Sequence, residues 1–268
     1  MAAGNYAACL AIVLEHEGGW ANHPKDPGGA TMKGVIQRTY DAYRRSKGLP
    51  LRSVRNITDP ELQEIYRRDY WNKVSGDALP AGIDLATFDG GVNSGPSRGV
   101  KWLQKALGVS QDGVAGPKTV GAANASDQRK VIVSMCAHRL GFLKALSHWS
   151  TFGKGWLRRV TGTEAKAVSM ALAKDLPKAS VPSELKAESS KAEGKAHAQE
   201  GTAVASGAGS AGSASQFDIS TLDSVMPWIA AGAAVALVVL AVVLIHKSRV
   251  NRERARAYAN VAQEVANG

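Results

Sequence analysis

The 268-residue sequence shows no disulfide framework, little strand periodicity and no N-terminal signal peptide. Its two cysteines, Cys9 and Cys136, lie among apolar residues of predicted helices, so we expect buried free thiols and not a disulfide framework. No alternation of apolar and polar residues predicts a strand, apart from a possible hairpin after residue 17. No basic segment followed by an uninterrupted apolar run marks a signal peptide at the N-terminus, since Glu15 breaks the first apolar run. The pattern predicts a mainly α-helical fold.

The positive charge is concentrated in one part of the chain. Residues 1–176 carry 24 Lys and Arg against 15 Asp and Glu, a net charge of +9 out of the total of +10. A basic domain attracts polyanions, either nucleic acid or a cell wall rich in carboxylates and phosphates. No nucleic-acid-binding motif accompanies the charge, so we expect a wall partner and no nucleic acid. His16 and His23 have no Cys or second carboxylate at ligand spacing, and we predict no metal site.

Residues 15–34 carry the candidate catalytic groups. Apolar residues at helical spacing predict a helix from about Asn5, with Glu17 as its last residue before Gly18 and Gly19. At that position the helix dipole favours the protonated carboxyl, which suits a general acid. The following glycine pairs and prolines predict a loop or short hairpin that returns Asp26 and Thr31 to the side of Glu17.

The same segment resembles a known enzyme family. Its sequence reads Glu17-Gly18-Gly19-Trp20, then Asp26-Pro27-Gly28-Gly29-Ala30-Thr31 and Gly34-Val35-Ile36, and it is similar to the glycoside hydrolase family 108 lysozymes, muramidases found mostly in bacteriophages and prophages. The resemblance implies that Glu17 is the catalytic acid. Phage-type lysozymes place an Asp nine residues after this Glu and a Thr six further on; here Asp26 keeps the spacing, and Thr31 follows it by five.

Glycoside hydrolysis requires a proton on the leaving oxygen and stabilisation of a positively charged sugar. We expect Glu17 to give the proton, Asp26 to stay ionised and activate water or stabilise the sugar, and Thr31 to position the water. Trp20 is expected to stack on a sugar ring. Carboxyl groups and water suffice for this reaction, so no cofactor is implied, and analogy favours inversion at the anomeric carbon.

A second resemblance follows in the chain. Residues 88–96 and 111–119, which include Asp-Gly-Val-Ala-Gly-Pro-Lys-Thr, look like the helical predicted peptidoglycan domain that accompanies family 108 segments. Asp89 and Asn93 are candidates to line the glycan cleft, although Asn93 is as well explained as part of a turn before Gly95 and Pro96. Together the two resemblances cover about residues 5–172.

Several helices are predicted outside these motifs. Thr58, Pro60 and Glu61 form a helix start, and that helix is expected to reach about Trp71. A long buried helix is predicted over residues 127–147 and a last one near residues 164–173.

The C-terminal third has a different composition. Residues 177–216 hold almost no large apolar side chain, which predicts a flexible linker, whereas residues 227–245 carry no charge, which predicts a transmembrane helix. Basic residues after Ile245 place the C-terminus in the cytoplasm by the positive-inside rule. The predicted protein is thus single-pass in the cytoplasmic membrane, with its catalytic domain on the periplasmic side. The expected segments are 1–80, lysozyme-like catalytic; 81–176, helical peptidoglycan-binding and packed with the first; 177–226, disordered linker; 227–245, transmembrane; and 246–268, basic tail.

The combined hypothesis is a monomeric, membrane-tethered muramidase with peptidoglycan and the lipid bilayer as partners. One alternative is a non-catalytic, membrane-anchored peptidoglycan-binding protein in which Glu17 is vestigial. Another is a membrane-perturbing lysis protein whose spanning helix is the active part.

Overall fold

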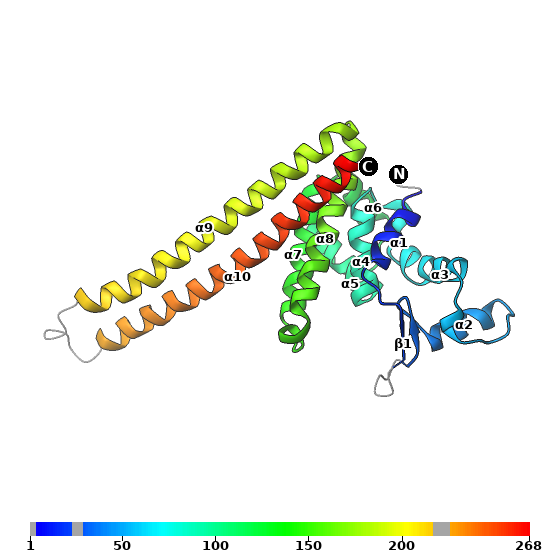
Figure 1. Cartoon of the computed structure of the whole chain (residues 1–268), viewed down its shortest axis with the longest axis horizontal. Helices are drawn as coiled ribbons and strands as arrows, with labels where there is room; N and C mark the ends of the chain where they lie inside the picture. Colours follow the sequence, from blue (N-terminus) through cyan, green and yellow to red (C-terminus); the bar gives the residue numbers. More distant parts are fainter. Residues whose placement is uncertain (1–3, 23–28, 217–225) are drawn as a thin grey trace. The chain divides into compact units, whose positions relative to one another are not determined.

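The computed structural model describes the backbone of residues 4–22, 29–216 and 226–268, and the side chains of these residues except 207–234. The chain divides into two compact units, Met1–Leu176 and Pro177–Gly268. The α-helices and strands of the first unit are α1 (Tyr6–Leu14), β1 (Trp20–Ala21), β2 (Thr31–Met32), β3 (Val35–Ile36), α2 (Gln37–Ser46), α3 (Asp59–Tyr66), α4 (Ile83–Ser94), α5 (Pro96–Leu107), α6 (Pro117–Asn124), α7 (Gln128–Lys144) and α8 (Trp149–Asp175). Short 3-10 turns occur at Val54–Asn56, Asn72–Val74 and Gly76–Ala78. The described part of this unit is mainly helical, as predicted, with one small sheet (Figure 1).

The core of the first unit is built around α4. Every residue from Ile83 to Gly91 is buried, and α4 contacts α1, α5, α7 and α8. A helix that has no basic residue and is apolar on most sides is suited to such a central position. Helices α4 and α5 cross closely: a Cβ on Gly99 would lie 2.7 Å from the Thr87 carbonyl oxygen. Helix α4 therefore acts as the support on which the other helices are placed.

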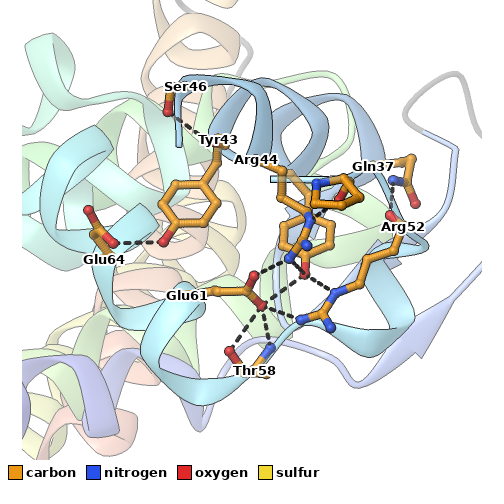
Figure 2. Close-up of polar contacts among 10 residues, drawn as sticks. Gln37, Tyr43, Arg44, Ser46, Arg52, Thr58, Glu61 and Glu64 are labelled. Carbon is orange, nitrogen blue, oxygen red and sulfur yellow. Dashed lines mark hydrogen bonds and ion pairs between the residues drawn. The ribbon is translucent and has the colours of Figure 1, made fainter. Parts of the chain in front are cut away.

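A buried ion-pair cluster joins α2 to the start of α3 (Figure 2). Glu61 accepts hydrogen bonds from Tyr40 (2.8 Å), Arg52 (2.7 Å) and the Thr58 backbone N–H (2.9 Å), and it pairs with Arg44. Burial raises the pKa of Glu61, but these hydrogen bonds outweigh it and hold the pKa at about 2. The predicted helix start at Thr58 and Glu61 is confirmed; it has the form of a capping box, and Glu61 also binds the neighbouring helix.

The sheet follows α1 directly. Its three strands are antiparallel in the order β1-β2-β3, with Trp20 opposite Met32 and Met32 opposite Val35. Strands β2 and β3 are joined by Lys33 (φ 47°) and Gly34 (φ 77°). Positive φ at both residues of a two-residue loop matches the twist of antiparallel strands. The possible hairpin after residue 17 is thus present as a small sheet.

Two helix ends differ from the predictions. Helix α3 ends at Tyr66 and continues as a π-helical turn, Arg67–Trp71. Helix α8 starts at Trp149 and not near residue 164, because its packing on α4 and α7 outweighs the low helix propensity of its glycines. The earlier start places residues 149–163 on one continuous helix.

The second unit contradicts the predicted disordered linker. Residues Val181–Gln216 form α9, which packs against α10 (Met226–Asn267). The linker prediction missed that alanine, lysine and glutamate favour helix and that small residues let two helices approach closely. The buried side chains in the described part of α9 recur at intervals of four and seven residues: Val181, Leu185, Ala192, Ala196 and Ala203. On α10 the buried apolar side chains are Val250, Ala255, Tyr258, Val261 and Ala262.

The predicted transmembrane helix at 227–245, and with it the single-pass membrane location, is wrong. No helix in the described part of the chain combines the length and the hydropathy that a membrane span requires. The apolar residues belong to the 42-residue helix α10, which continues after Ile245 into a polar, charged stretch. Asp218 and Asp223, which precede this helix in the sequence, lie outside the described residues.

Candidate active site

Glu17 lies beyond the end of α1 and not within it. The helix ends at Leu14, and the Glu17 backbone N–H donates to the Leu14 carbonyl oxygen (3.2 Å) in a following turn. The prediction that Glu17 is the last helical residue is therefore wrong by three residues, since the chain already turns toward β1 here. Its side chain is 18% exposed, so it has access to solvent and is also held by protein groups.

An arginine from α8 binds Glu17. Arg159 Nη1 lies 3.0 Å from Glu17 Oε1, although the two residues are 142 positions apart in the chain. The other two nitrogens of Arg159, Nε and Nη2, donate to Asp89 Oδ1 at 2.9 and 2.7 Å. Arg159 thus connects the end of α1 to the central helix α4.

Asp89 anchors this arginine from inside the core. It is 1% exposed, and its Oδ2 accepts from Arg139 Nη1 and from the Thr163 hydroxyl (3.0 Å). Burial raises the pKa of Asp89, but the guanidinium groups of Arg139 and Arg159 outweigh it and hold the pKa well below its usual range. Asp89 is therefore an ionised carboxylate shared between two buried cations. We call these residues the Asp89 cluster: Glu17, Asp89, Arg139, Arg159 and Thr163.

The β2–β3 turn closes the other side of Glu17. A Cβ on Gly34 would lie 2.9 Å from Glu17 Oε2 and 2.4 Å from the Tyr66 hydroxyl oxygen, so the bare glycine permits both contacts. The Tyr66 hydroxyl donates to the Lys33 carbonyl oxygen (2.9 Å). Burial and the nearby Glu17 charge raise the pKa of Tyr66, which keeps the phenol protonated as a donor. Glu17 therefore has one oxygen on Arg159 and the other beside Gly34.

Of the other predicted site residues, one lies outside the described residues and three make contacts of their own. Asp26 falls within residues 23–28, which the structure does not describe. The Thr31 hydroxyl, on β2, donates to the Gly29 carbonyl oxygen (3.2 Å). Trp20, on β1, is 37% exposed, and the Arg55 guanidinium lies 5.6 Å from its ring centroid. Asn93 lies near the end of α4, where its Oδ1 accepts from the Ser94 hydroxyl (3.2 Å).

The groups that hold Glu17 had no direct signal in the sequence. Arg139, Arg159 and Thr163 are separated from it by more than a hundred residues, and no spacing in the chain links them to it. An available clue was the occurrence of arginines in the otherwise apolar turns of α7 and α8, because buried arginines need a carboxylate partner. Asp89, in a helix with few charges, was the natural partner to test.

A mainly helical unit with a small sheet and a partly exposed glutamate between them fits a lysozyme-like protein. Residues 10–95 match the family model of Glycosyl hydrolase 108, and residues 98–161 match the Predicted Peptidoglycan domain. The solved structure of Brucella abortus SagA is 44% identical, with a TM-score of 0.56, over 63% of this chain and 96% of that one. A comparison with curated proteins finds no match. The chain belongs to the glycosyl hydrolase 108 family, and its partner is peptidoglycan, which it hydrolyses or binds.

Proposed function

We propose that the chain is an N-acetylmuramidase that cleaves the glycan strands of peptidoglycan, with Glu17 as the general acid. The observation that carries the proposal is the position of Glu17. It is partly exposed, it lies between the sheet and the helical core, and its carboxyl group is bound by Arg159 of α8 and lies beside Gly34 of the β2–β3 turn. A catalytic carboxyl must be oriented to within a fraction of an ångström, and such supporting contacts provide that orientation.

In this mechanism Glu17 protonates the glycosidic oxygen as the bond to the anomeric carbon breaks. Asp26 stays ionised and activates the attacking water, Thr31 orients that water, and the outcome is inversion. Trp20 and Asn93 contact the glycan. Asp89 has both carboxylate oxygens occupied and is 1% exposed, so its role here is to position Arg159 and not to contact the sugar.

The second candidate function is a peptidoglycan-binding protein without catalysis. The observation in its favour is that Arg159 already occupies Glu17 Oε1, so that only Oε2 remains for a substrate oxygen. Under this alternative the chain has no turnover, Glu17 is a structural member of the Asp89 cluster, and its replacement changes stability.

The experiment measures reducing ends released from purified peptidoglycan by the full chain and by Glu17→Gln. We expect the variant to lose at least about a hundredfold in rate, as for removal of a general acid. Glu15→Gln is the matched control, because Glu15 is two residues away, its side chain is 54% exposed, and it pairs with Lys166. The control is expected to keep its activity.

The products identify the bond that is cleaved. Borohydride reduction followed by hydrolysis should give reduced muramic acid if the enzyme is a muramidase. Reduced glucosamine would indicate cleavage of the other glycosidic bond and contradict the muramidase assignment. A wild-type chain that sediments with peptidoglycan but releases no reducing ends would support the binding protein instead.

A further inference from the structure

Three aromatic side chains lie on the face of α8 that also carries Arg159. Trp149, Phe152, Trp156, Arg159 and Thr163 follow one another at intervals of three and four residues. In an α-helix this spacing places them along one face. The C-terminal part of the face is inside the core, because Arg159 and Thr163 bind Asp89 there. We call Trp149, Phe152 and Trp156 the aromatic stripe.

Within the aromatic stripe Phe152 is exposed, and Trp149 and Trp156 are half-buried. On this face Thr163 is 0% exposed and the Arg159 side chain 12%, whereas Phe152 is 52% exposed. Figure 1 shows α7 and α8 side by side, with α8 beginning at one end of the pair. Ten residues separate Trp149 from Arg159, which corresponds to about 15 Å along the helix. The stripe thus extends from the Glu17 site to solvent over the length of a few sugar units.

The rings hold one another in place. The Phe152 and Trp156 ring centroids are 5.8 Å apart at 33°, and those of Trp149 and Trp156 are 6.2 Å apart at 46°. A Cβ on Gly153 would lie 2.7 Å from the Trp149 ring, so this indole rests on bare helix backbone. Aromatic side chains with few rotatable bonds and mutual contacts lose little entropy on binding. The stripe is therefore a preorganised apolar surface and not a loose set of exposed residues.

The chemistry of the surface fits a pyranose ring. The ring C–H groups of a sugar are weakly positive and pack on the negative face of an aromatic ring. On the sheet side of the site, the aromatic residue proposed to contact the glycan is Trp20, whose ring also lies near Arg55. A glycan strand whose scissile bond lies at Glu17 continues past the site, and the stripe is joined to the site by the same face of α8.

Resting on the proposed function, we infer that the aromatic stripe is an accessory glycan subsite, which stacks on sugar rings of a peptidoglycan strand beyond the bond that is cleaved. It increases the affinity for long strands and does not change the affinity for fragments that end near Glu17. The stripe therefore controls the preference for chain length and not the chemical step.

The test uses the full chain with Phe152→Ala, Trp156→Ala and Phe152→Tyr. Leu51→Ala is the control, because Leu51 is similarly exposed (50%) and lies away from α8. Initial rates are measured on solubilised glycan strands of two lengths, short fragments of two disaccharide repeats and long strands. The alanine variants should raise KM for long strands by about three- to tenfold, with kcat unchanged, and should leave short fragments unaffected. Phe152→Tyr and Leu51→Ala should match the wild type.

The same substitutions in a Glu17→Gln background separate this inference from the proposed function. Binding to the long strands, measured without cleavage, should weaken by the same three- to tenfold. If the wild type cleaves nothing but the stripe variants still weaken binding, the muramidase proposal fails and the subsite stands. If the wild type cleaves but the alanine substitutions change KM equally for long strands and short fragments, or change it for neither, the subsite is overturned. A change in sedimentation coefficient of the alanine variants without ligand would identify the stripe as a self-association face and would also overturn it.

Discussion

The replacement Asp89→Asn tests the Asp89 cluster most directly. The substitution keeps the size of the side chain but removes the charge shared by Arg139 and Arg159, whose nitrogens lie within hydrogen-bond distance of both oxygens. Nε and Nη2 of Arg139 are buried and have no hydrogen-bond partner among the described residues, so this guanidinium has little else to compensate its charge. Loss of one partner of a buried ion pair costs about 3–5 kcal/mol. We expect the free energy of unfolding to fall by that amount at pH 7.

The dependence on pH gives the prediction a second test. The pKa of Asp89 is well below its usual range in the folded chain, whereas in the unfolded chain it is about 3.9. The ionised carboxylate therefore contributes its full stabilisation above about pH 5, and the contribution is lost as the pH falls below about 4. The difference between wild type and Asp89→Asn should shrink in that range.

Urea unfolding of the full chain, followed by tryptophan fluorescence, measures this difference. Five of the six tryptophans lie in residues 1–176, so the signal reports mainly on the first unit. Asp59→Asn is the control: it breaks the exposed ion pair with Lys33 (3.1 Å) and should cost at most about 1 kcal/mol. A loss below 1 kcal/mol for Asp89→Asn, or a loss that is the same at pH 3 and pH 7, would refute the argument that a buried charge holds the cluster together.

Three further changes address the rest of the first unit. Glu61→Gln should lower the free energy of unfolding by about 3 kcal/mol at pH 7, since the pKa of Glu61 is about 2 and not 4.5. The effect should disappear as the pH falls from 4.5 toward 2, and an unchanged urea midpoint at pH 7 would contradict the prediction. Gly34→Ala should lower the free energy of unfolding by about 1–2 kcal/mol, because residue 34 has a φ of 77°. By displacing Glu17 or Tyr66 it should also reduce kcat on the order of a hundredfold, and a rate equal to wild type would show that the turn does not position Glu17. In Arg159→Lys the single ammonium group cannot bind Asp89 and Glu17 at the same time. We expect kcat to fall about tenfold or more, KM to stay within about twofold and the pH–rate profile to shift. An unchanged kcat would show that Arg159 does not position Glu17.

Much of the fold was accessible from local sequence signals. The capping box at Thr58 and Glu61, the helix over residues 128–144 and the hairpin after Glu17 all depend on neighbouring residues, and the structure contains them. The predictions failed where packing competes with composition. Glycines 153, 155 and 162 did not interrupt α8, and an alanine-rich segment read as disordered forms α9 because α10 covers it. The uncharged run at 227–245 belongs to a longer helix that continues into a charged stretch.

By itself, the sequence determined the candidate acid and its family, because the Glu-Gly-Gly-Trp motif and the residues after it are contiguous in the chain. Only the tertiary structure decided what holds that acid. Arg159 reaches Glu17 across 142 residues, and Asp89, which the sequence offered as a candidate to line the glycan cleft, is the buried counter-ion of this arginine. The physical reason is that an ion pair depends on distance and burial, which the packing of α1, α4 and α8 sets and which no spacing along the chain encodes.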